Sequence, residues 1–293
     1  MTPGLSVLIL TLNEEINLPR VLESVKWSDD VVVFDSFSSD GTVEIARAAG
    51  ARVIQRRFDN ERAHRLASLQ CEFKHPWVYN PDADEVATPE LQQEMLALAG
   101  DVSRPEVAWV VRRKDMFMGR WIKHSSLYPT WLLRLFRPSA ITFDRLVNLT
   151  YTASGSVGRL QSHLIHYSFA KGLGEWVGKH NKYSDWEALE TIKVTAEPLP
   201  PLASLMSADP IVRRAALKRF SAHLPCRSFL RFVYMYFWRG GFLDGVAGYH
   251  YCRLISLYEY LISIKAKELE RQTSIAYPLK QAPLDSPQRL IGR

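Results

Sequence analysis

Short apolar runs alternate with amphipathic stretches along the first hundred residues. Runs of β-branched and aliphatic residues predict buried strands, at residues 5–10, 30–35, 51–55 and 77–80. Apolar positions at helical spacing predict helices between them, at residues 15–25, 38–50, 61–70 and 89–100. Strands separated by helices of this length indicate right-handed βαβ units and a largely parallel sheet. The pattern therefore predicts an α/β fold.

The rest of the chain follows this pattern less closely. Strands are predicted at 107–113 and 130–137, and a glycine-rich stretch at 153–160 interrupts the regular pattern. The proline-rich segment at 197–205 predicts a linker, and helical periodicity dominates after it. We therefore expect three parts: an α/β domain over 1–195, a linker over 196–208, and a helical region over 209–293.

Composition and charge describe a folded chain with anionic partners. Nearly half of the 293 residues are apolar, and the net charge of +6 favours phosphorylated ligands, nucleic acid or an anionic membrane. Three scattered cysteines form neither a zinc motif nor a disulfide framework, which favours a reducing, cytoplasmic setting. The first apolar run has no basic stretch before it and no cleavage site after it, so we interpret it as a strand rather than a signal peptide.

The helical region is basic and aromatic. Residues 209–239 hold seven Lys and Arg side chains against one acid, interleaved with aromatic residues. Charged residues interrupt every apolar window, so no membrane span is predicted. The composition favours peripheral association with an anionic membrane surface, on the inner face of the cytoplasmic membrane. The alternative is a helical subdomain that pairs its charges internally. No groove-reading motif is present, so we expect no nucleic-acid binding.

Three acids follow the strand predicted at 77–80. Asp82 and Asp84 are two residues apart, so in extended chain both carboxylates would lie on one side. No Lys or Arg adjoins them, and such an oxygen pair suits Mg²⁺ or Mn²⁺ held partly by substrate phosphates. The alternative is that the acids stabilise the start of the following helix.

Two earlier loops also follow predicted strands. They are "TLNEE" at 11–15 and "DSFSSDGT" at 35–42. In open parallel sheets, ligands bind beyond the carboxyl ends of the strands. Asp35 at such an end can accept hydrogen bonds from a nucleobase or a ribose, although an acid here is also common in ordinary turns.

Together these segments resemble a known family. "LSVLILTLNEEINLPRVLESV", "DDVVVFDSFSSDGTVEIARAAGARVI", "HPWVYNPDADEVATPEL" and "GRWIKHSSLYPTWLLRLFRP" are similar to family 2 glycosyltransferases with a GT-A fold. The resemblance is to the branch with lipopolysaccharide core β-1,4-glucosyltransferases and exopolysaccharide glycosyltransferases. It implies an inverting, metal-dependent transfer from a nucleotide-diphosphate sugar to a lipid-linked, lipopolysaccharide or polysaccharide acceptor.

The resemblance also implies roles for particular residues. Five residues would form the nucleotide pocket: Thr11, Asn13, Glu14, Asp35 and Asp82. Asp82 would reach the ribose or the metal water shell, Asp84 would bind the metal, and Glu85 would support the loop. Arg62 or Arg65 could approach the diphosphate, because a guanidinium offers paired donors, although a solvated helix face explains them equally well.

The catalytic base is less clearly marked. Many relatives carry a His-Glu pair just after the "RLFR" strand, where this chain has Asn148 and Leu149. The nearest acids are Asp144, which we favour, and Asp115. His166 in "HLIHY" resembles the late histidine that serves some GT-A enzymes as a metal ligand, although a single histidine on a strand is more often structural.

Two other functions share these motifs. A sugar-phosphate nucleotidyltransferase would need a glycine-rich, basic loop after the first strand, and "TLNEEINLP" has no such feature. A catalytically degenerate subunit that binds nucleotide sugars or polysaccharides would explain the missing His-Glu pair. Release of nucleotide diphosphate from a sugar donor separates an enzyme from this second alternative.

Overall fold

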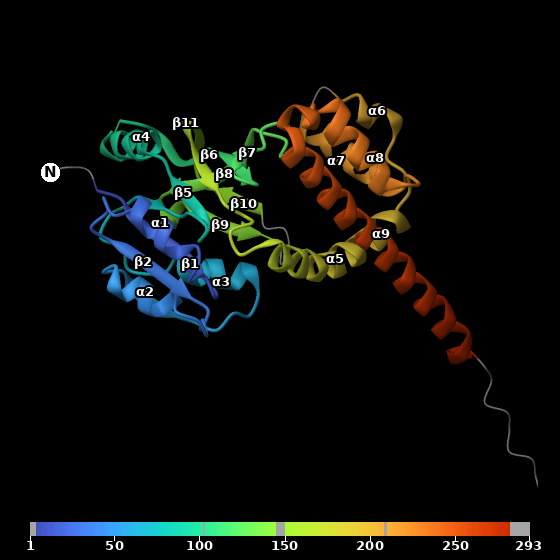
Figure 1. Ribbon diagram of the computed structural model, residues 1–293, viewed down its shortest axis with the longest axis horizontal. Coiled ribbons are helices and arrows are strands. Elements are labelled where there is room, and N and C mark those ends of the chain that lie inside the picture. Colours follow the sequence, from blue (N-terminus) through green and yellow to red (C-terminus); the bar gives the residue numbers. More distant parts are fainter. Residues whose placement is uncertain (1–3, 102, 145–149, 208–209, 282–293) are drawn as a thin grey trace, which may run out of the picture. The chain divides into compact units, whose positions relative to one another are not determined.

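The computed structural model describes residues 4–101, 103–144, 150–207 and 210–281 (Figure 1). Its contacts divide the chain into two compact units. The first comprises Met1–Trp176 and Arg239–Tyr249, and the second comprises Val177–Trp238 and His250–Arg293. A short segment of the C-terminal part of the chain therefore belongs with the N-terminal unit.

A mixed sheet forms the framework of the first unit. Its strands are ordered β3-β2-β1-β4-β8-β6-β11-β5, and β7 pairs with the end of β6. The bounds are β1 Ser6–Thr11, β2 Val31–Asp35, β3 Arg52–Gln55, β4 Val78–Tyr79, β5 Glu85–Ala87, β6 Glu106–Phe117, β7 Arg120–Trp121, β8 Thr130–Phe136 and β11 Ser156–His166. A separate hairpin consists of β9 Ile141–Asp144 and β10 Thr150–Ala153.

The first four strands of this order form the parallel half that the alternating pattern predicts. Thr11 at the end of β1 pairs with Asp35 at the end of β2, and Leu10 bridges to Asp82 just beyond β4. Strand β8 is antiparallel to both β4 and β6, so antiparallel pairs join the mostly parallel arrangement that the sequence predicts and the complete sheet is mixed. The register brings the three predicted strand-end loops to one edge.

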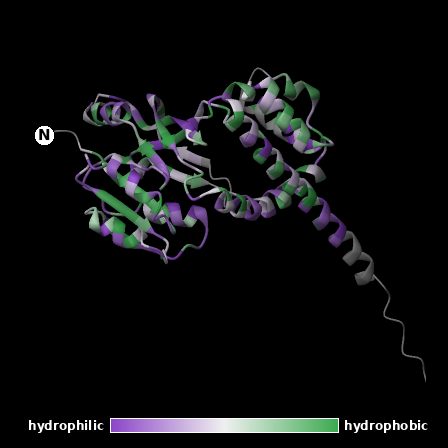
Figure 2. Cartoon of the chain, in the orientation of Figure 1, coloured by the Kyte–Doolittle hydropathy of each residue, from purple (hydrophilic) through white to green (hydrophobic). Residues whose placement is uncertain are grey.

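Helices α1 Leu18–Ser24, α2 Thr42–Ala48, α3 Glu61–Ser68 and α4 Pro89–Gly100 lie against the sheet. Alternate strand residues face opposite sides, so two apolar cores form, one around Ile9 and Val111 and the other around Leu8 and Val110. Figure 2 shows the central strands as largely hydrophobic ribbons. Both faces of the sheet are therefore packed.

Strand β11 includes most of the glycine-rich stretch at 153–160, which the sequence predicts to be irregular. A Cβ on Gly158 would lie 2.2 Å from the Trp109 ring, so this glycine makes room for a neighbouring side chain. The next residues form a bulge, where Glu94 accepts hydrogen bonds from the Gln161 and Ser162 N–H groups. Gly158 is therefore needed for close packing, although a glycine-rich stretch in a sequence is also typical of a loop.

The second unit is helical. Its elements are most of α5 Leu173–Ala196, then α6 Leu202–Leu205, α7 Pro210–Ala222, α8 Arg227–Val233, the π-helix Tyr234–Trp238, and most of α9 Gly245–Gln281. Lys265 pairs with Asp185 at 2.6 Å, and Arg227 pairs with Glu259 at 2.8 Å. These ion pairs connect α9 with α5 and α8. Within the described ranges, none of the helices combines the length and apolarity that crossing a bilayer requires.

Candidate active site

The ends of β1 and β2 hold a buried carboxylate. Asp35 is fully buried and accepts hydrogen bonds from Thr11 Oγ1 (2.9 Å), Ser38 Oγ (2.5 Å), the Ser38 N–H (2.9 Å) and Gln55 Nε2 (3.0 Å). Burial raises the pKa of Asp35, but these donors outweigh it and hold the pKa below its ordinary value. Asp35 is therefore ionised, and its hydrogen bonds connect the predicted loops at 11–15 and 35–42.

The "TLNEE" loop is tied to the second predicted loop and to a later segment. Asn13 has a φ of 55° and its Oδ1 accepts from the Ser39 N–H at 2.8 Å. The Glu14 N–H donates to Thr42, and Glu14 Oε1 accepts from Lys171 Nζ at 2.7 Å. Lys171 was not predicted as a site residue, because nothing in its local sequence indicates contact with a residue more than 150 positions earlier.

The acidic stretch contains a neutralising cation that the sequence interpretation missed. Arg134 on β8 donates to Glu85 Oε2 at 2.6 Å and Oε1 at 2.8 Å, and also to Asp82. Glu85 is fully buried and Arg134 nearly so. Burial alone would lower the pKa of Arg134, but the charges of Asp82 and Glu85 raise it. The expectation of an unneutralised acid pair was wrong, because the cation comes from another strand.

Asp84 belongs to a different group. Its Oδ2 lies 3.3 Å from Nε2 of His166, whose Nδ1 donates to Asp115 at 2.6 Å. Asp115 also lies 3.0 Å from Arg113. Burial would lower the pKa of His166, but its bonds to Asp115 and Asp84 raise it to about 9. The structure thus brings three predicted site residues into one chain of contacts.

The chain turns at residues 83–84, so it is not extended between the two aspartates. As a result Asp82 contacts Arg134, whereas Asp84 contacts His166. The capped-helix alternative was also wrong for this stretch. Strand β5 separates the acids from α4, and Thr88 caps that helix by accepting from the Leu91 N–H.

The two predicted arginines lie on α3. Arg65 Nη2 contacts Asp82 Oδ1 at 3.4 Å, so it lies beside the acidic stretch. Arg62 Nε donates to the Phe143 carbonyl at 2.8 Å, which directs that guanidinium to β9. Arg65 therefore lies closer to the site than Arg62. Asp144 ends β9, but its side chain, Asn148 and Leu149 lie outside the described residues.

The donor groups suit a divalent cation that also binds substrate. In the described ranges, no group of three His, Cys, Asp or Glu side chains is arranged as a complete metal site. Asp84 and His166 instead supply an oxygen and a nitrogen 3.3 Å apart. Asp115 holds the other ring nitrogen, as outer carboxylates do for metal-binding histidines. Mg²⁺ at such sites is usually held by one or two protein ligands, mostly carboxylates, while substrate phosphates and water complete its shell.

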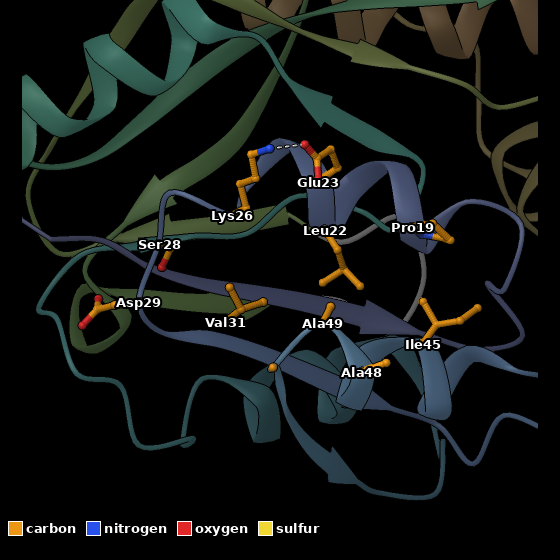
Figure 3. A pocket seen from close by; sticks show the side chains of 11 residues that line it. Pro19, Leu22, Glu23, Lys26, Ser28, Asp29, Val31, Ile45, Ala48 and Ala49 are labelled. Carbon is orange, nitrogen blue, oxygen red and sulfur yellow. Dashed lines mark hydrogen bonds and ion pairs between the residues drawn. The ribbon is translucent and has the colours of Figure 1, made fainter.

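The first unit also contains a groove of about 720 Å³ between α1 and α2, with Leu22, Val31 and Ile45 on its walls (Figure 3). Asp29 at its end precedes β2, so the groove reaches the amino ends of the strands. None of the predicted site residues lines it. The predicted site residues lie instead at the carboxyl edge.

Comparison with known proteins shows the family to which the chain belongs. Residues 6–163 match glycosyl transferase family 2. The chain is 28% identical to the lipopolysaccharide core biosynthesis glycosyltransferase LpsC of Rhizobium meliloti, over 66% of this chain and 74% of that protein. It is 29% identical to an uncharacterized glycosyltransferase of Rickettsia typhi, over 64% of this chain and 68% of that protein.

Two solved structures are also similar. S. aureus TarS (residues 1–349) aligns at 15% identity and a TM-score of 0.41, covering 96% of this chain and 93% of that chain. Glucosyl-3-phosphoglycerate synthase of Mycobacterium tuberculosis, with Mn²⁺ and UDP-glucose, aligns at 23% identity and a TM-score of 0.32, covering 39% and 44%. The α/β fold with C-terminal helices is as the sequence predicts. From the family match, the chain belongs to glycosyl transferase family 2 and is a glycosyltransferase that uses nucleotide-sugar donors.

Proposed function

We propose that this glycosyltransferase is metal-dependent and inverting, and that it acts on a lipid-linked, lipopolysaccharide or exopolysaccharide acceptor. The pairing of Asp84 with His166 at the carboxyl edge of the sheet is the observation that carries the proposal. An acid and an imidazole in contact, with a carboxylate behind the imidazole, support a cation site better than a surface ion pair.

Asp84 and His166 would hold Mg²⁺ or Mn²⁺. When bound, such an ion stabilises negative charge on the departing nucleotide diphosphate. Asp115 fixes the His166 ring so that Nε2 faces Asp84. We assign Asp82 to the ribose or the metal water shell, and Arg134 keeps that carboxylate ionised and oriented.

The nucleotide would lie on the loops after β1 and β2. Thr11, Asn13 and Asp35 form one hydrogen-bonded unit there, because Ser38 joins the Asn13 N–H to Asp35. Asp35 is saturated with donors inside the protein, which favours a role in shaping the base pocket. Glu14, paired with Lys171, borders this pocket, and Arg65 beside Asp82 is our candidate to contact the diphosphate.

Inversion requires one base to deprotonate the acceptor hydroxyl. Asp115 is buried and its Oδ1 is engaged by His166 and Arg113, so its contacts favour orientation of the histidine. Asp144 at the end of β9 therefore stays our preferred base.

Two observations support an acceptor at a membrane. One relative bears the name of a lipopolysaccharide core glycosyltransferase. In addition, the turn within Arg239–Tyr249 exposes 49% of Phe242, 59% of Leu243 and 66% of Val246. Buried Asp244 anchors this turn by accepting from the His124 and Ser125 N–H groups at 2.9 and 2.7 Å. A fixed turn with exposed apolar side chains suits peripheral insertion into a bilayer surface.

The direct test is release of nucleotide diphosphate from a panel of nucleotide sugars, with and without Mn²⁺. Wild-type protein should release it only with the metal. Asp84→Asn should reduce the rate by about 10³-fold, because charge on the leaving group loses its stabilisation. Asp101→Asn, an exposed acid at the end of α4, is the matched control and should behave as wild type.

Three outcomes of this test would count against the proposal. Donor binding without any release, hydrolysis included, would favour a degenerate binding subunit. Equal rates with Mn²⁺ and with a chelator would contradict metal dependence. Retention of the anomeric configuration in the product would contradict inversion.

A further inference from the structure

Strand β6 presents cations on both of its faces, and the two faces differ in charge balance. Arg113 and Asp115 share one face, with 3.0 Å between Nε and Oδ1. Arg112 and Lys114 lie on the opposite face, because side chains alternate along a strand. No carboxylate lies within ion-pair distance of either of these two in the described part of the chain. One face is therefore neutralised and the other is not.

The uncompensated side extends over four strands and the segment after β7. Arg112 and Arg159 lie over Trp131, with Cζ 5.7 and 5.4 Å from the ring centroid. Lys114 and Lys123 lie over Trp121, with Nζ 4.5 and 5.6 Å from its centroid. We call these side chains the β6 cation cluster: Arg112, Lys114, Lys123, Arg159, Trp121 and Trp131.

The positive charge of this region acts on nearby titratable groups. Burial, and then the charge of Arg112, lower the pKa of Lys114. Burial, followed by the charges of Lys114 and Arg112, lowers the pKa of His163 on β11. Glu90 is the acid that acts in the opposite direction on both groups, and it makes no ion pair with either in the described residues. Nε of Arg112 is buried without a hydrogen-bond partner.

We propose that the β6 cation cluster binds the anionic group of a phosphorylated saccharide acceptor. A guanidinium and an ammonium on adjacent same-side positions give charge-assisted donors to one phosphate, and the unpartnered Arg112 Nε supplies a further one. The tryptophans offer apolar surface to a sugar ring. The assignment to an acceptor rests on the proposed transfer reaction. Lys114 faces away from Asp115, but both residues lie near the carboxyl end of β6, at the edge that holds the candidate metal site.

The partial burial of the cluster favours a discrete phosphate over an extended surface. Arg112, Lys114, Trp121 and Trp131 are only partly exposed. A lipid bilayer contacts side chains that protrude, as Leu243 does in the exposed turn. Nucleic acid needs a row of accessible cations along its backbone. A single phosphate carried on a sugar fits a compact, half-buried set of donors.

Fluorine NMR of protein labelled with 5-fluorotryptophan tests the inference on the full chain. Glucose 6-phosphate should shift the Trp121 and Trp131 resonances in a saturable way, and glucose at equal concentration should not. Trp→Phe variants assign the resonances. Trp109 is the internal control: it lies at the other end of β6 beneath Arg104, which already pairs with Asp101 at 3.1 Å. Its resonance should stay in place.

Charge removal should weaken the binding. R112Q/K114Q is expected to raise the dissociation constant for glucose 6-phosphate by about tenfold or more, because two charge-assisted contacts are lost. If that variant unfolds, K123Q/R159Q provides the same test at exposed positions. R104Q, which alters a compensated cation beside a tryptophan, should leave the constant unchanged.

Several results would overturn the inference. Equal shifts with glucose and glucose 6-phosphate would show that charge plays no part. A shift of Trp109 as large as that of Trp121 would indicate a general ionic effect. Response to phosphatidylglycerol vesicles without response to glucose 6-phosphate would assign the cluster to a lipid surface.

Titration of the same samples with Mn²⁺ and a panel of nucleoside diphosphates separates this inference from the proposed function. Nucleotide binding without a tryptophan response to glucose 6-phosphate would defeat the acceptor subsite alone. Absence of binding by every nucleotide in the panel would count against the nucleotide site, whatever the cluster does.

Discussion

The acids of the stretch Asp82–Glu85 belong to two clusters, and the clusters differ in the cationic side chain that the acids contact. Asp82 and Glu85 bind Arg134, which keeps its charge at any accessible pH. Asp84 meets His166, whose imidazole can lose its proton and become a metal ligand. Asp82 and Glu85 therefore have a permanently charged partner, whereas the partner of Asp84 can lose its charge.

The difference follows from strand order. Strand β8 pairs with β4, which places Arg134 beside Asp82 and Glu85. Strand β11 pairs with β5, which places His166 beside Asp84. Arg134 and Glu85 of the first cluster are buried, whereas the Asp82 side chain is 39% exposed. The second cluster lies at the ends of β6 and β11. Removing the permanent cation should therefore affect stability, while altering the histidine group should affect metal binding and pH dependence.

The largest effect is expected for Arg134→Gln. Glu85 is fully buried, and without Arg134 it becomes an unpaired charge. The free energy of unfolding should fall by about 3–5 kcal/mol, measured by denaturant titration. R104Q removes an exposed ion pair with Asp101 and should change stability by less than about 1 kcal/mol. Similar small losses in both variants would show that the first cluster is not structural.

A pH titration distinguishes the clusters next. The pKa of His166 is raised to about 9, so its stabilising contribution is complete below about 6.5, its value in the unfolded chain. That contribution is lost as pH rises through about 9. In chelator-treated protein, the free energy of unfolding should therefore fall by roughly 3 kcal/mol across this window. His166→Gln should abolish this component, and an unchanged pH profile in that variant would refute the assignment.

The smallest effect concerns the carboxylate behind the histidine. Asp115→Asn should weaken Mn²⁺ binding by about 10–100-fold in calorimetry, because the imidazole loses its orienting charge. Asp101→Asn alters an exposed acid at the end of α4, which pairs with Arg104 rather than with this group, and should leave Mn²⁺ affinity unchanged within about twofold. Equal losses of affinity in both variants would mean that the loss is not specific to the His166 group.

Hydrophobic periodicity predicted much of the fold. The alternation of strand and helix over the first hundred residues predicts the parallel half of the sheet, and the elements lie within a few residues of their expected ranges. It failed at β11, because Gly158 accommodates Trp109 from another strand. A local pattern cannot separate a glycine needed for close packing from one needed for a turn.

The sequence by itself determined which acids lie at strand ends, since each directly follows an apolar run. It also marked His166 and Asp115 as separate candidates. Only the tertiary structure decided their partners: Arg134 with Asp82 and Glu85, His166 with Asp84 and Asp115, and Lys171 with Glu14. The reason is physical, because hydrophobic periodicity is a local property, whereas charge pairing depends on which distant strands become neighbours.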